Sequence, residues 1–486
     1  MSFFKAYDMR GTFGVDFDLE TVYKVGKALP QVVKGKHWLV GRDCRVTSKD
    51  VRDALVKGLE EAGAEVRDLG LCTTPMVYFF TAEEGFDGSV MITASHNPPS
   101  DNGLKVSMRT ALPVGYANGL NEVERIVLTP SNPNAPLTFR KFKDGEALAR
   151  FARTEGVGSP EGEARAAKRS PEAESSDSSE LNRYLEWMKA RRPDFGELRY
   201  AIDCSNGMAS ILVHELFPDA VIINDTPDGT FPNHSPNPLK AEAREQIAAL
   251  VRERGLDCGL IFDGDADRCM FVDEKGDFVQ PDYLIPIAAR ATLNSNTQTL
   301  KHSNNPKIIH DVRTSRGAIE ELKRMGCEPV MVPVGHAFAK PILREIGAVC
   351  GGELAGHYYF SEFHGCDSGV LAALRILGEI ANAKASGKAF SEMMKPIGGV
   401  YANSGEMNFK VEDKDAAIER VLATAAAKLT RAISRSEIDG IRIEYEEGWI
   451  NIRKSNTEPY LRLIVECDTV ERLKDWVAIL KTAVEA

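Results

Sequence analysis

The sequence of 486 residues contains no C-x-x-C pair, no long apolar run and no excess of positive charge. Its nine cysteines are scattered and odd in number, which excludes a disulfide framework or zinc knuckle and is typical of reduced core thiols. A membrane-spanning helix needs about 18 consecutive apolar residues, so no membrane span is expected. The net charge of −11 argues against a nucleic-acid binder, because phosphate backbones require a basic face.

The amino-terminal segment lacks the pattern of a signal peptide. Charges at Lys5, Asp8 and Arg10 stand where an apolar stretch would be needed. We therefore expect a cytoplasmic protein. The length favours three or four domains of roughly 150 residues each, and a hydrophobic content of 43% is enough to form several cores.

The same short pattern recurs in three parts of the chain: an apolar strand-like run, a helical segment and a second extended run. The three copies cover residues 37–66, 199–223 and 307–332. In the first copy Ser48 is the expected N-cap of the helix, and Gly63 is its expected end. This order predicts βαβ units, which require mostly parallel sheets with helices on their faces. Three similar α/β domains are therefore expected, with chance recurrence of a common unit as the alternative.

The end of the chain has a different pattern. Residues 448–452 and 460–465 predict paired strands, and apolar residues at helical spacing over 470–484 predict a closing helix. These elements indicate a smaller C-terminal α+β domain. Residues 154–180 are mainly Glu, Ser, Ala, Gly, Pro, Lys and Arg, which predicts a flexible linker. The predicted organisation is a domain at 1–150, a linker at 151–180, domains at 181–278 and 279–395, and a C-terminal domain at 396–486.

An acidic loop follows the apolar run 260–262. Asp263, Asp265 and Asp267 occupy every second position of this loop, with Gly264 between the first two. Carboxylates at this spacing suit a hard cation such as Mg²⁺ or Ca²⁺. An EF-hand loop is a rival interpretation, since Glu274 stands at its twelfth position. However, Arg268 occupies the sixth position, where an EF-hand turn needs glycine. A solvated acidic turn is the remaining alternative.

A serine loop, Thr93–Pro99, follows the strand-like run 90–92 and contains Ser95, His96 and Asn97. A serine on a loop at a strand end can act as a nucleophile once a base or a cation activates it. No G-x-S-x-G elbow surrounds Ser95, which disfavours an ordinary serine hydrolase. Taken alone, the loop could equally be a turn with capping hydroxyls.

Two further loops have polar groups suited to a sugar phosphate. Glu353 and His357 lie four residues apart between glycines, where they could bind sugar hydroxyls and move a proton. The segment that begins at Arg453 joins the last two predicted strands and reads R-K-S-N-T-E-P, an arrangement suited to binding an anion. Taken alone, each loop also has a purely structural explanation.

Together these four loops, in this order and with Lys5–Gly11, resemble the α-D-phosphohexomutase superfamily. The resemblance spans nearly the whole chain apart from the linker. It is closest to the phosphomannomutase/phosphoglucomutase branch, because the last loop reads S-N-T-E-P where phosphoglucosamine mutases tend to have S-G-T-E-P. The resemblance implies an α/β fold: three similar domains with mixed or parallel sheets and a smaller C-terminal α+β domain, heart-shaped around a central cleft.

The resemblance also implies a role for each matching residue. Ser95 would carry the phosphoryl group, and Mg²⁺ would bind the phosphoserine oxygen with Asp263, Asp265 and Asp267. The implied catalytic set adds Lys105 and His357 as acid or base candidates, together with Arg10 and His96. The implied substrate-binding set is Tyr7, Arg268, Arg313, His336, Glu353, Arg453, Ser455, Asn456 and Thr457. One departure is Ala355, where relatives often have serine, and it leaves the hexose preference open.

The implied activity is that of an isomerase of hexose phosphates. It would interconvert hexose 1-phosphate and hexose 6-phosphate through phosphoserine and a hexose 1,6-bisphosphate, which is both intermediate and activator. Phosphomannomutase is the single best expectation. Phosphoglucomutase, phosphoglucosamine mutase, a sugar phosphatase and a non-catalytic sugar-phosphate sensor are the alternatives. The expected partners are small hexose phosphates, and the chain is expected to be a monomer or a homodimer.

Overall fold

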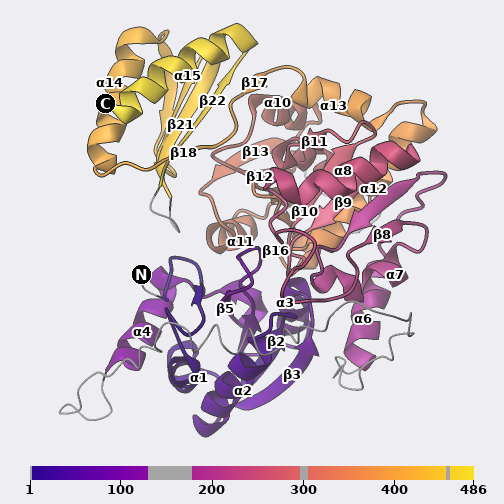
Figure 1. Ribbon diagram of the computed structural model, residues 1–486, viewed down its shortest axis with the longest axis vertical. Coiled ribbons are helices and arrows are strands. Elements are labelled where there is room, and N and C mark those ends of the chain that lie inside the picture. The colour runs from indigo at the N-terminus through magenta and orange to yellow at the C-terminus, as the bar shows by residue number, and fades with distance from the viewer. Residues whose placement is uncertain (1–2, 130–177, 296–304, 456–459) are drawn as a thin grey trace, which may run out of the picture.

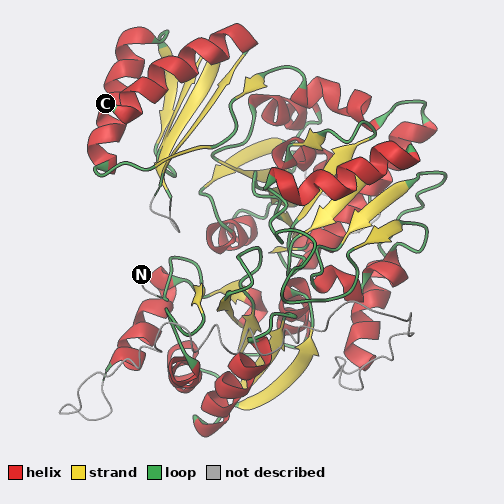
Figure 2. Ribbon diagram, viewed as in Figure 1, coloured by secondary structure: helices red, strands yellow, loops and turns green. Residues whose placement is uncertain are grey.

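The computed structural model describes residues 3–129, 178–295, 305–455 and 460–486. Four sheets, each with its own helices, follow one another along the chain (Figures 1 and 2), and we name the parts built on them domains I to IV. Domain I lies at the bottom of Figure 1 and domain IV at its upper left. Among the described helices, none combines the length and the hydropathy that a bilayer crossing requires.

Domain I is built on a six-stranded sheet. Its elements are β1 (Met9–Thr12), α1 (Leu19–Val33), β2 (His37–Arg42), α2 (Ser48–Glu61), β3 (Glu65–Leu71), α3 (Thr74–Glu83), β4 (Gly88–Ile92), β5 (Asp101–Met108), β6 (Leu112–Pro113) and α4 (Leu120–Leu128). The strand order is β3-β2-β4-β5-β1, and β6 also pairs with β5. β2 is parallel to β3 and β4, whereas β5 is antiparallel to β4 and β1.

Domains II and III repeat this topology. Domain II contains α6 (Ser178–Lys189), β7 (Tyr200–Asp203), α7 (Val213–Leu216), β8 (Val221–Ile223), α8 (Ala241–Arg254), β9 (Cys258–Phe262), β10 (Cys269–Asp273) and β11 (Phe278–Val279). Domain III contains α9 (Ile285–Asn294), β12 (Lys307–Asp311), α10 (Arg316–Arg324), β13 (Glu328–Val332), α11 (His336–Glu345), β14 (Cys350–Gly352), β15 (Tyr358–Phe360), β16 (Cys366–Asp367), α12 (Gly369–Ala385) and α13 (Phe390–Gly398). The orders are β8-β7-β9-β10-β11 and β13-β12-β14-β15-β16.

In all three sheets, one strand is parallel to both of its neighbours and the next strands are antiparallel. β7 is parallel to β8 and β9, and β12 is parallel to β13 and β14. β10 and β15 then run antiparallel to β9 and β14. The prediction of three similar α/β domains is therefore confirmed.

Domain IV has an antiparallel sheet covered by two helices. It contains β17 (Ala402–Asn403), β18 (Met407–Phe409), α14 (Lys414–Lys428), β19 (Ala432–Ser436), β20 (Ile441–Tyr445), β21 (Gly448–Lys454), β22 (Leu461–Cys467) and α15 (Val470–Glu485). The order is β17-β22-β21-β20-β19, with β18 also beside β22. The predicted pairing of the last two strands and the predicted closing helix are both confirmed.

Domains I to III share one apolar core. The ring of Phe79 on α3 of domain I lies 5.4 Å from that of Tyr184 on α6 and 6.1 Å from that of Phe363 in domain III. These residues belong to a single buried cluster that extends to α13. Domain IV has a separate cluster between its sheet and its two helices, which includes Leu463 and Trp476.

Domain IV is attached to domain III by buried polar contacts. Arg442 on β20 donates from Nη1 to the carbonyl oxygens of Val312 at 2.6 Å and Thr314 at 2.9 Å. The backbone N–H of Arg316 donates to Glu466 on β22 at 2.8 Å. These bonds fix the orientation of domain IV over the ends of β12 and α10.

Two local expectations need correction. Ser48 is the first residue of α2 and not its N-cap; its Oγ donates to Asp43 Oδ1 at 2.6 Å. Residues 178–180, which we placed in the linker, belong to α6, where buried Glu180 pairs with Arg67 at 2.9 Å. The rest of the predicted linker, 151–177, lies outside the described residues.

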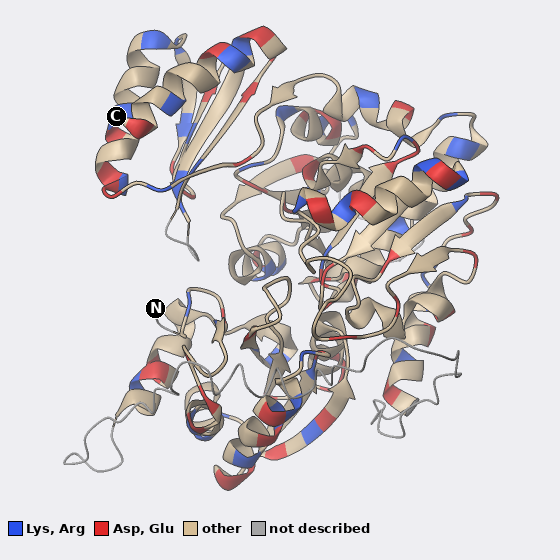
Figure 3. Ribbon diagram, in the orientation of Figure 1, with Lys and Arg blue, Asp and Glu red and all other residues tan. Residues whose placement is uncertain are grey.

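The outer surface and the thiols agree with the composition. Acidic and basic residues are interspersed on the outer helices α8, α14 and α15 (Figure 3). All nine cysteines are free thiols; eight are buried and Cys44 is half-buried. Burial raises the pKa of Cys44 to about 12, so this thiol is protonated at neutral pH.

Candidate active site

Three of the four predicted loops occupy the same place in their domains. The Ser95 loop joins β4 to β5, the Asp263 loop joins β9 to β10, and the Glu353 loop joins β14 to β15. Each follows the last parallel strand of its sheet. Because parallel strands place their carboxyl ends at one edge, each domain offers its loop at the edge where α/β folds bind ligands. The fourth loop joins β21 to β22 in domain IV.

Ser95 is buried where the first two loops touch. Its Oγ donates to Asp263 Oδ2 at 2.8 Å and lies 3.1 Å from Nδ1 of His96. Because the hydroxyl proton is directed to Asp263, Nδ1 of His96 is the donor in the second contact. Burial and the charge of Arg268 hold the pKa of His96 well below its usual range, so this ring is neutral.

The backbone of the Ser95 loop is strained and tightly packed. Ser95 has a φ of 51°, in the left-handed region that non-glycine residues rarely adopt. A Cβ added at Gly264 would lie 2.5 Å from the Ser95 carbonyl oxygen, so only glycine lets the two loops approach this closely. Strained, buried backbone of this kind is characteristic of functional sites.

Arg45 holds the Ser95 loop in place, and sequence reasoning missed it. Its guanidinium donates to the carbonyl oxygens of Ser95 and Asn97 at 2.8 Å, Pro98 at 2.7 Å and Asp101 at 2.9 Å. Four carbonyls of one loop therefore depend on one side chain. The sequence did contain a signal: Asp43-Cys44-Arg45 directly follows β2, and Asp311-Val312-Arg313 begins at the last residue of β12, the equivalent place in domain III.

The three aspartates of the second loop are fully buried beside Ser95. Lys105 Nζ lies 2.7 Å from Asp265 Oδ2 and 2.5 Å from Asp267 Oδ2, and Thr74 Oγ1 donates to Asp265 Oδ2 at 2.5 Å. Burial would lower the pKa of Lys105, but the two carboxylates outweigh this and raise it. Lys105 is therefore a cation in this arrangement.

A divalent cation fits this cluster. Each aspartate offers one oxygen, and the three oxygens lie within 4.8 Å of one another. Among the described residues, Oδ1 of Asp265 and of Asp267 is buried without a hydrogen-bond partner. Burial, with the charges of Asp267 and Asp265, raises the pKa of Asp263 well above its usual range. All three observations fit oxygen ligands for a hard divalent cation such as Mg²⁺.

The EF-hand interpretation is wrong. The acidic loop lies between antiparallel strands β9 and β10, not between helices. Glu274, its proposed twelfth-position ligand, binds the backbone N–H of Ser391 at 3.0 Å and the Ser391 hydroxyl at 2.5 Å. Glu274 therefore joins domain II to α13 of domain III.

The loop of domain III brings Glu353 and His357 to the same cluster. His357 Nε2 lies 3.5 Å from Asp267 Oδ1, and its Nδ1 lies 3.5 Å from Glu353 Oε2. Burial and Arg268 lower the pKa of His357, but the Asp267 and Glu353 carboxylates outweigh them and raise it to about 9. Arg268 Nε also lies 3.1 Å from His357 Nε2 and favours the neutral ring. The charge of His357 is thus set by competition between Asp267 and Arg268.

Glu353 is itself held firmly. Its Oε1 accepts from the backbone N–H of Gly335 at 3.1 Å and from the Tyr359 hydroxyl at 2.8 Å. Burial would raise the pKa of Glu353, but His357, Arg313 and Tyr359 lower it to about 2. Sequence reasoning also missed a buried neighbour, Asp367, whose Oδ2 lies 3.7 Å from His357 Nε2.

The amino-terminal residues of the candidate set, Tyr7 and Arg10, lie near the boundary between domains I and III. Arg10 Nη1 donates to Asn97 Oδ1 at 3.1 Å, which places it against the Ser95 loop. The Tyr7 hydroxyl donates to the carbonyl oxygen of Val334 in domain III at 3.1 Å. The ring of His336, at the start of α11, lies 6.3 Å from that of Tyr7 and 6.1 Å from that of His357.

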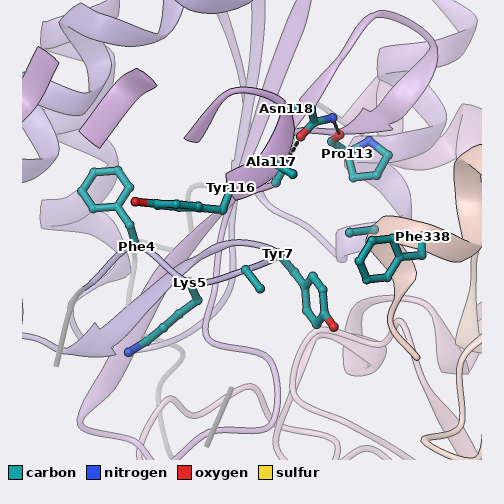
Figure 4. Close-up of a pocket in the computed structure, with 11 residues that line it drawn as sticks. Phe4, Lys5, Tyr7, Pro113, Tyr116, Ala117, Asn118 and Phe338 are labelled. Carbon is teal, nitrogen blue, oxygen red and sulfur yellow. Dashed lines mark hydrogen bonds between the residues drawn. The ribbon is translucent and has the colours of Figure 1, made fainter. Parts of the chain in front are cut away.

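A cavity of about 670 Å³ adjoins Tyr7 at this boundary (Figure 4). Domain I lines it with Phe4, Lys5, Pro113 and residues 115–118, among others, and domain III lines it with Ala337 and Phe338. The Tyr7 and Phe338 rings meet edge to face, with centroids 5.6 Å apart. The buried cluster around Ser95 does not line this cavity.

The phosphate-binding candidates of domains III and IV form a second group. Arg453 Nη2 donates to Glu406 Oε1 at 2.8 Å, Arg462 Nη1 donates to Glu406 Oε2 at 2.9 Å, and Arg313 Nη1 lies 3.6 Å from Glu406 Oε1. The backbone N–H of Ser455 donates to the Tyr460 carbonyl oxygen at 2.9 Å. Asn456 and Thr457 lie outside the described residues.

The structure therefore gathers the predicted residues into two groups. One surrounds Ser95 and comprises His96, Arg10, Lys105, the three aspartates, Arg268, Glu353 and His357. The other comprises Arg313 and Arg453 around Glu406. Neither Glu406 nor Arg462 was predicted, and nothing local in the sequence distinguishes them.

Four family models match successive parts of the chain. The model for phosphoglucomutase/phosphomannomutase, alpha/beta/alpha domain I, matches residues 1–133. Those for alpha/beta/alpha domains II and III of the same family match 182–276 and 280–397. The model for its C-terminal domain matches 406–483.

Individual relatives match over nearly the whole length. A phosphomannomutase of Salmonella montevideo is 33% identical over 476 residues, which cover 95% of this chain and 94% of the relative. A phosphomannomutase of Methanocaldococcus jannaschii is 33% identical over 487 residues, covering 99% and 97%. The crystal structure of a phosphoglucomutase/phosphomannomutase family protein from Burkholderia thailandensis is 27% identical, with a TM-score of 0.79 over 99% of this chain and 97% of that one.

Proposed function

Because the chain belongs to the phosphoglucomutase/phosphomannomutase family, and is thus an isomerase that transfers phosphoryl groups on hexose phosphates, we propose that it is a phosphomannomutase. In this proposal it interconverts mannose 1-phosphate and mannose 6-phosphate, with Ser95 as the phosphoryl carrier. The buried contact between Ser95 Oγ and Asp263, inside a cluster of three aspartates, is the observation that carries the role of Ser95. The names of the relatives that are 33% identical support the choice of mannose.

The first half-reaction moves the phosphoryl group from Ser95 to the free hydroxyl of the sugar. The bond between phosphorus and Ser95 Oγ breaks as the sugar oxygen bonds to phosphorus, and the hydroxyl proton passes to a nearby base. Because Lys105 is a cation, it is the candidate acid, and His357 in its neutral form is the candidate base to hold that proton. Mg²⁺ bound by Asp263, Asp265, Asp267 and a phosphoserine oxygen would offset negative charge on the transferring group.

The second half-reaction returns a phosphoryl group to Ser95 from the opposite end of the sugar. The hexose 1,6-bisphosphate must turn end over end between the two transfers. Arg453 and the turn at Ser455 hold whichever phosphate is distal, because a guanidinium binds phosphate through parallel hydrogen bonds whatever sugar is attached. Glu353, which belongs to the Ser95 group, and His336, whose ring lies 6.1 Å from that of His357, are the candidates to contact the sugar ring.

Exclusion of water distinguishes such a mutase from a phosphatase. Ser95 and the three aspartates have no exposed surface, so phosphoserine formed there is protected from hydrolysis. Arg45 holds the loop carbonyls and keeps the strained Ser95 backbone in place while the group is transferred.

The test is incubation of the purified protein and Mg²⁺ with mannose 1-phosphate, glucose 1-phosphate or glucosamine 1-phosphate, with products identified by NMR. We expect mannose 6-phosphate to form with the largest kcat/KM. Release of inorganic phosphate would identify a sugar phosphatase instead, and binding without turnover would identify a sensor. A larger kcat/KM for glucose 1-phosphate or glucosamine 1-phosphate would assign the chain to phosphoglucomutase or phosphoglucosamine mutase.

A further inference from the structure

Three arginines from two domains converge on one carboxylate. Arg453 on β21 and Arg462 on β22 bind the two oxygens of Glu406 at 2.8 and 2.9 Å. Arg313, which follows β12 in domain III, approaches the same carboxylate at 3.6 Å. Glu406 lies on the connection between β17 and β18, where the chain enters domain IV from domain III. One side chain at the domain boundary therefore contacts the phosphate-binding candidates of both domains.

The charge of Glu406 is needed to keep these guanidiniums together. Like charges repel strongly in a buried site, and the Arg453 side chain is only 2% exposed. Burial would raise the pKa of Glu406, but Arg313, Arg453 and Arg462 outweigh this and lower it to about 2. Glu406 is consequently ionised throughout the neutral range, and its attraction offsets the mutual repulsion of the arginines.

The repeated topology shows what is different about Arg313. In domain I the backbone N–H and Nε of Arg45 bind Asp43, and its outer nitrogens hold carbonyls of the same domain. In domain III the backbone N–H and Nε of Arg313 bind Asp311 in the same way. Its outer nitrogen Nη1 instead faces Glu406 across the domain boundary. The same local motif thus serves a loop in one domain and an interdomain contact in the other.

Arg453 retains donors for a ligand. Glu406 uses only its Nη2, and Nε of Arg453 is buried with no hydrogen-bond partner among the residues that the structure describes. A buried guanidinium nitrogen without an acceptor is unfavourable, and a phosphate oxygen would relieve this.

We propose that Glu406 is a positioning residue for the distal phosphate: it orients Arg453 and keeps Arg313 beside it, without touching the reacting atoms. The inference rests on the proposed function, in which Arg453 binds the phosphate that is not being transferred. Loss of the Glu406 charge lets the guanidiniums separate and weakens the grip on both hexose 1-phosphate and hexose 6-phosphate. The transfer at Ser95 is unaffected once substrate is bound.

The test compares full-length wild-type protein with Glu406→Gln, which keeps the size of the side chain but removes its charge. We expect KM for mannose 1-phosphate and for mannose 6-phosphate to rise by the same factor, about 10- to 100-fold, the usual range for one charged contact. We expect kcat to stay within about threefold. Glu406→Asp should recover part of the loss. Glu412→Gln, at an exposed position on the segment after β18, is the matched control and should leave both constants unchanged.

A double mutant shows whether Glu406 acts through Arg453. If it does, Glu406→Gln adds little to the KM of an Arg453→Ala protein, since the residue to be positioned is gone. Fully additive effects would overturn the proposal, as would an unchanged KM. A fall in KM would also overturn it, because Glu406 would then be a competitor of phosphate.

A binding measurement separates this inference from the proposed function. The dissociation constant of inorganic phosphate, measured by calorimetry, should rise in Glu406→Gln in parallel with KM. If the wild-type protein forms no hexose 6-phosphate, the proposed function fails. Weaker phosphate binding in Glu406→Gln would still support the role of Glu406, and equal binding in the two proteins would refute it.

Discussion

The two ends of the site balance their charges in different ways. Around Ser95, three buried aspartates converge, with Lys105 and Arg268 beside them. Around Glu406, three arginines face one another, and Asp311 compensates only the far side of Arg313. The first end is suited to a cation and the second to an anion.

The two ends also differ in how they are assembled. The residues at the Ser95 end come from domains I to III, which share a continuous apolar core. The residues at the Glu406 end come from domains III and IV, which have separate cores joined by polar contacts. The shared core fixes the positions of the residues at the Ser95 end, as the proposed transfer chemistry requires. Under the proposed function, the separately cored distal end is the part that would accept both orientations of the bisphosphate.

The largest effect is expected at the reacting end. Ser95→Ala should abolish the phosphoenzyme and reduce turnover by several orders of magnitude, because the proposed phosphoryl carrier is removed. Intact-mass measurement after incubation with hexose 1,6-bisphosphate is the readout. Ser89→Ala is the matched control, since Ser89 is equally buried on β4, four residues before the loop. Undiminished phosphorylation of Ser95→Ala would contradict the assignment.

Substitution of the two equivalent arginines, Arg45 in domain I and Arg313 in domain III, tests whether the two ends of the site have different roles. Arg45→Ala removes charged hydrogen bonds to four loop carbonyls, each of about 1.5–3 kcal/mol, so kcat should fall at least about tenfold. The melting temperature should also fall, because Asp43 would be left buried without its partner. Arg313→Ala should instead raise KM more than it lowers kcat. Steady-state kinetics and thermal melting of both variants are the measurements. A rise mainly in KM for Arg45→Ala, together with a fall mainly in kcat for Arg313→Ala, would contradict this expectation.

A third test concerns the grip on the intermediate. Arg453→Ala should lower kcat/KM by about 10- to 150-fold, the cost of one charged hydrogen bond. It should also release more hexose 1,6-bisphosphate per turnover, and added bisphosphate should partly restore the rate. Arg453→Lys should recover only part of the loss, since lysine has the charge without the fork. Wild-type values for both the kinetics and the bisphosphate loss would mean that another group holds the distal phosphate.

The smallest effect on catalysis is expected at the junction of domains III and IV. A substitution there should change mainly the stability of the protein. Burial, with the charges of Glu466 and Asp311, raises the pKa of Asp282 to about 7, against about 4 in an unfolded chain. Its ionisation therefore favours unfolding, and this lowers stability as the pH rises from about 4 to 7.

Asp282→Asn removes this penalty and keeps an acceptor for the Ser315 N–H, which lies 2.9 Å from Asp282 Oδ2. Its stabilisation should be larger at pH 8, on the order of 2–4 kcal/mol, than at pH 5. Thermal unfolding at both pH values is the measurement, with exposed Asp475→Asn as the control. An equal gain at the two pH values would show that Asp282 does not titrate in this range.

Much of the fold could be predicted because its signals are local. The alternation of apolar runs with helical spacing revealed the three βαβ units, and Gly63 ends α2 with a positive φ as expected. The Ser95 and Asp263 loops could be recognised because polar residues follow directly on buried strands. Their contact with each other needed the packing of two domains, which no local pattern contains.

The missed residues act across long distances in the sequence. Arg45 binds a loop 50 residues away, and Glu406 binds Arg453 47 residues away and Arg313 in another domain. Ser48 is a good N-cap by residue type, but Asp43 offered its hydroxyl a buried acceptor and the helix begins one residue earlier. Such pairings depend on how distant segments dock.

The most direct test of the account is a single-turnover transfer from labelled enzyme. Protein labelled on phosphate by hexose 1,6-bisphosphate is mixed with excess mannose 1-phosphate and Mg²⁺, and the label is followed on Ser95, on sugar and in inorganic phosphate. We predict that the label leaves a peptide containing Ser95 and appears on mannose bisphosphate and mannose 6-phosphate. Label on another residue, or label released as inorganic phosphate, would contradict the account.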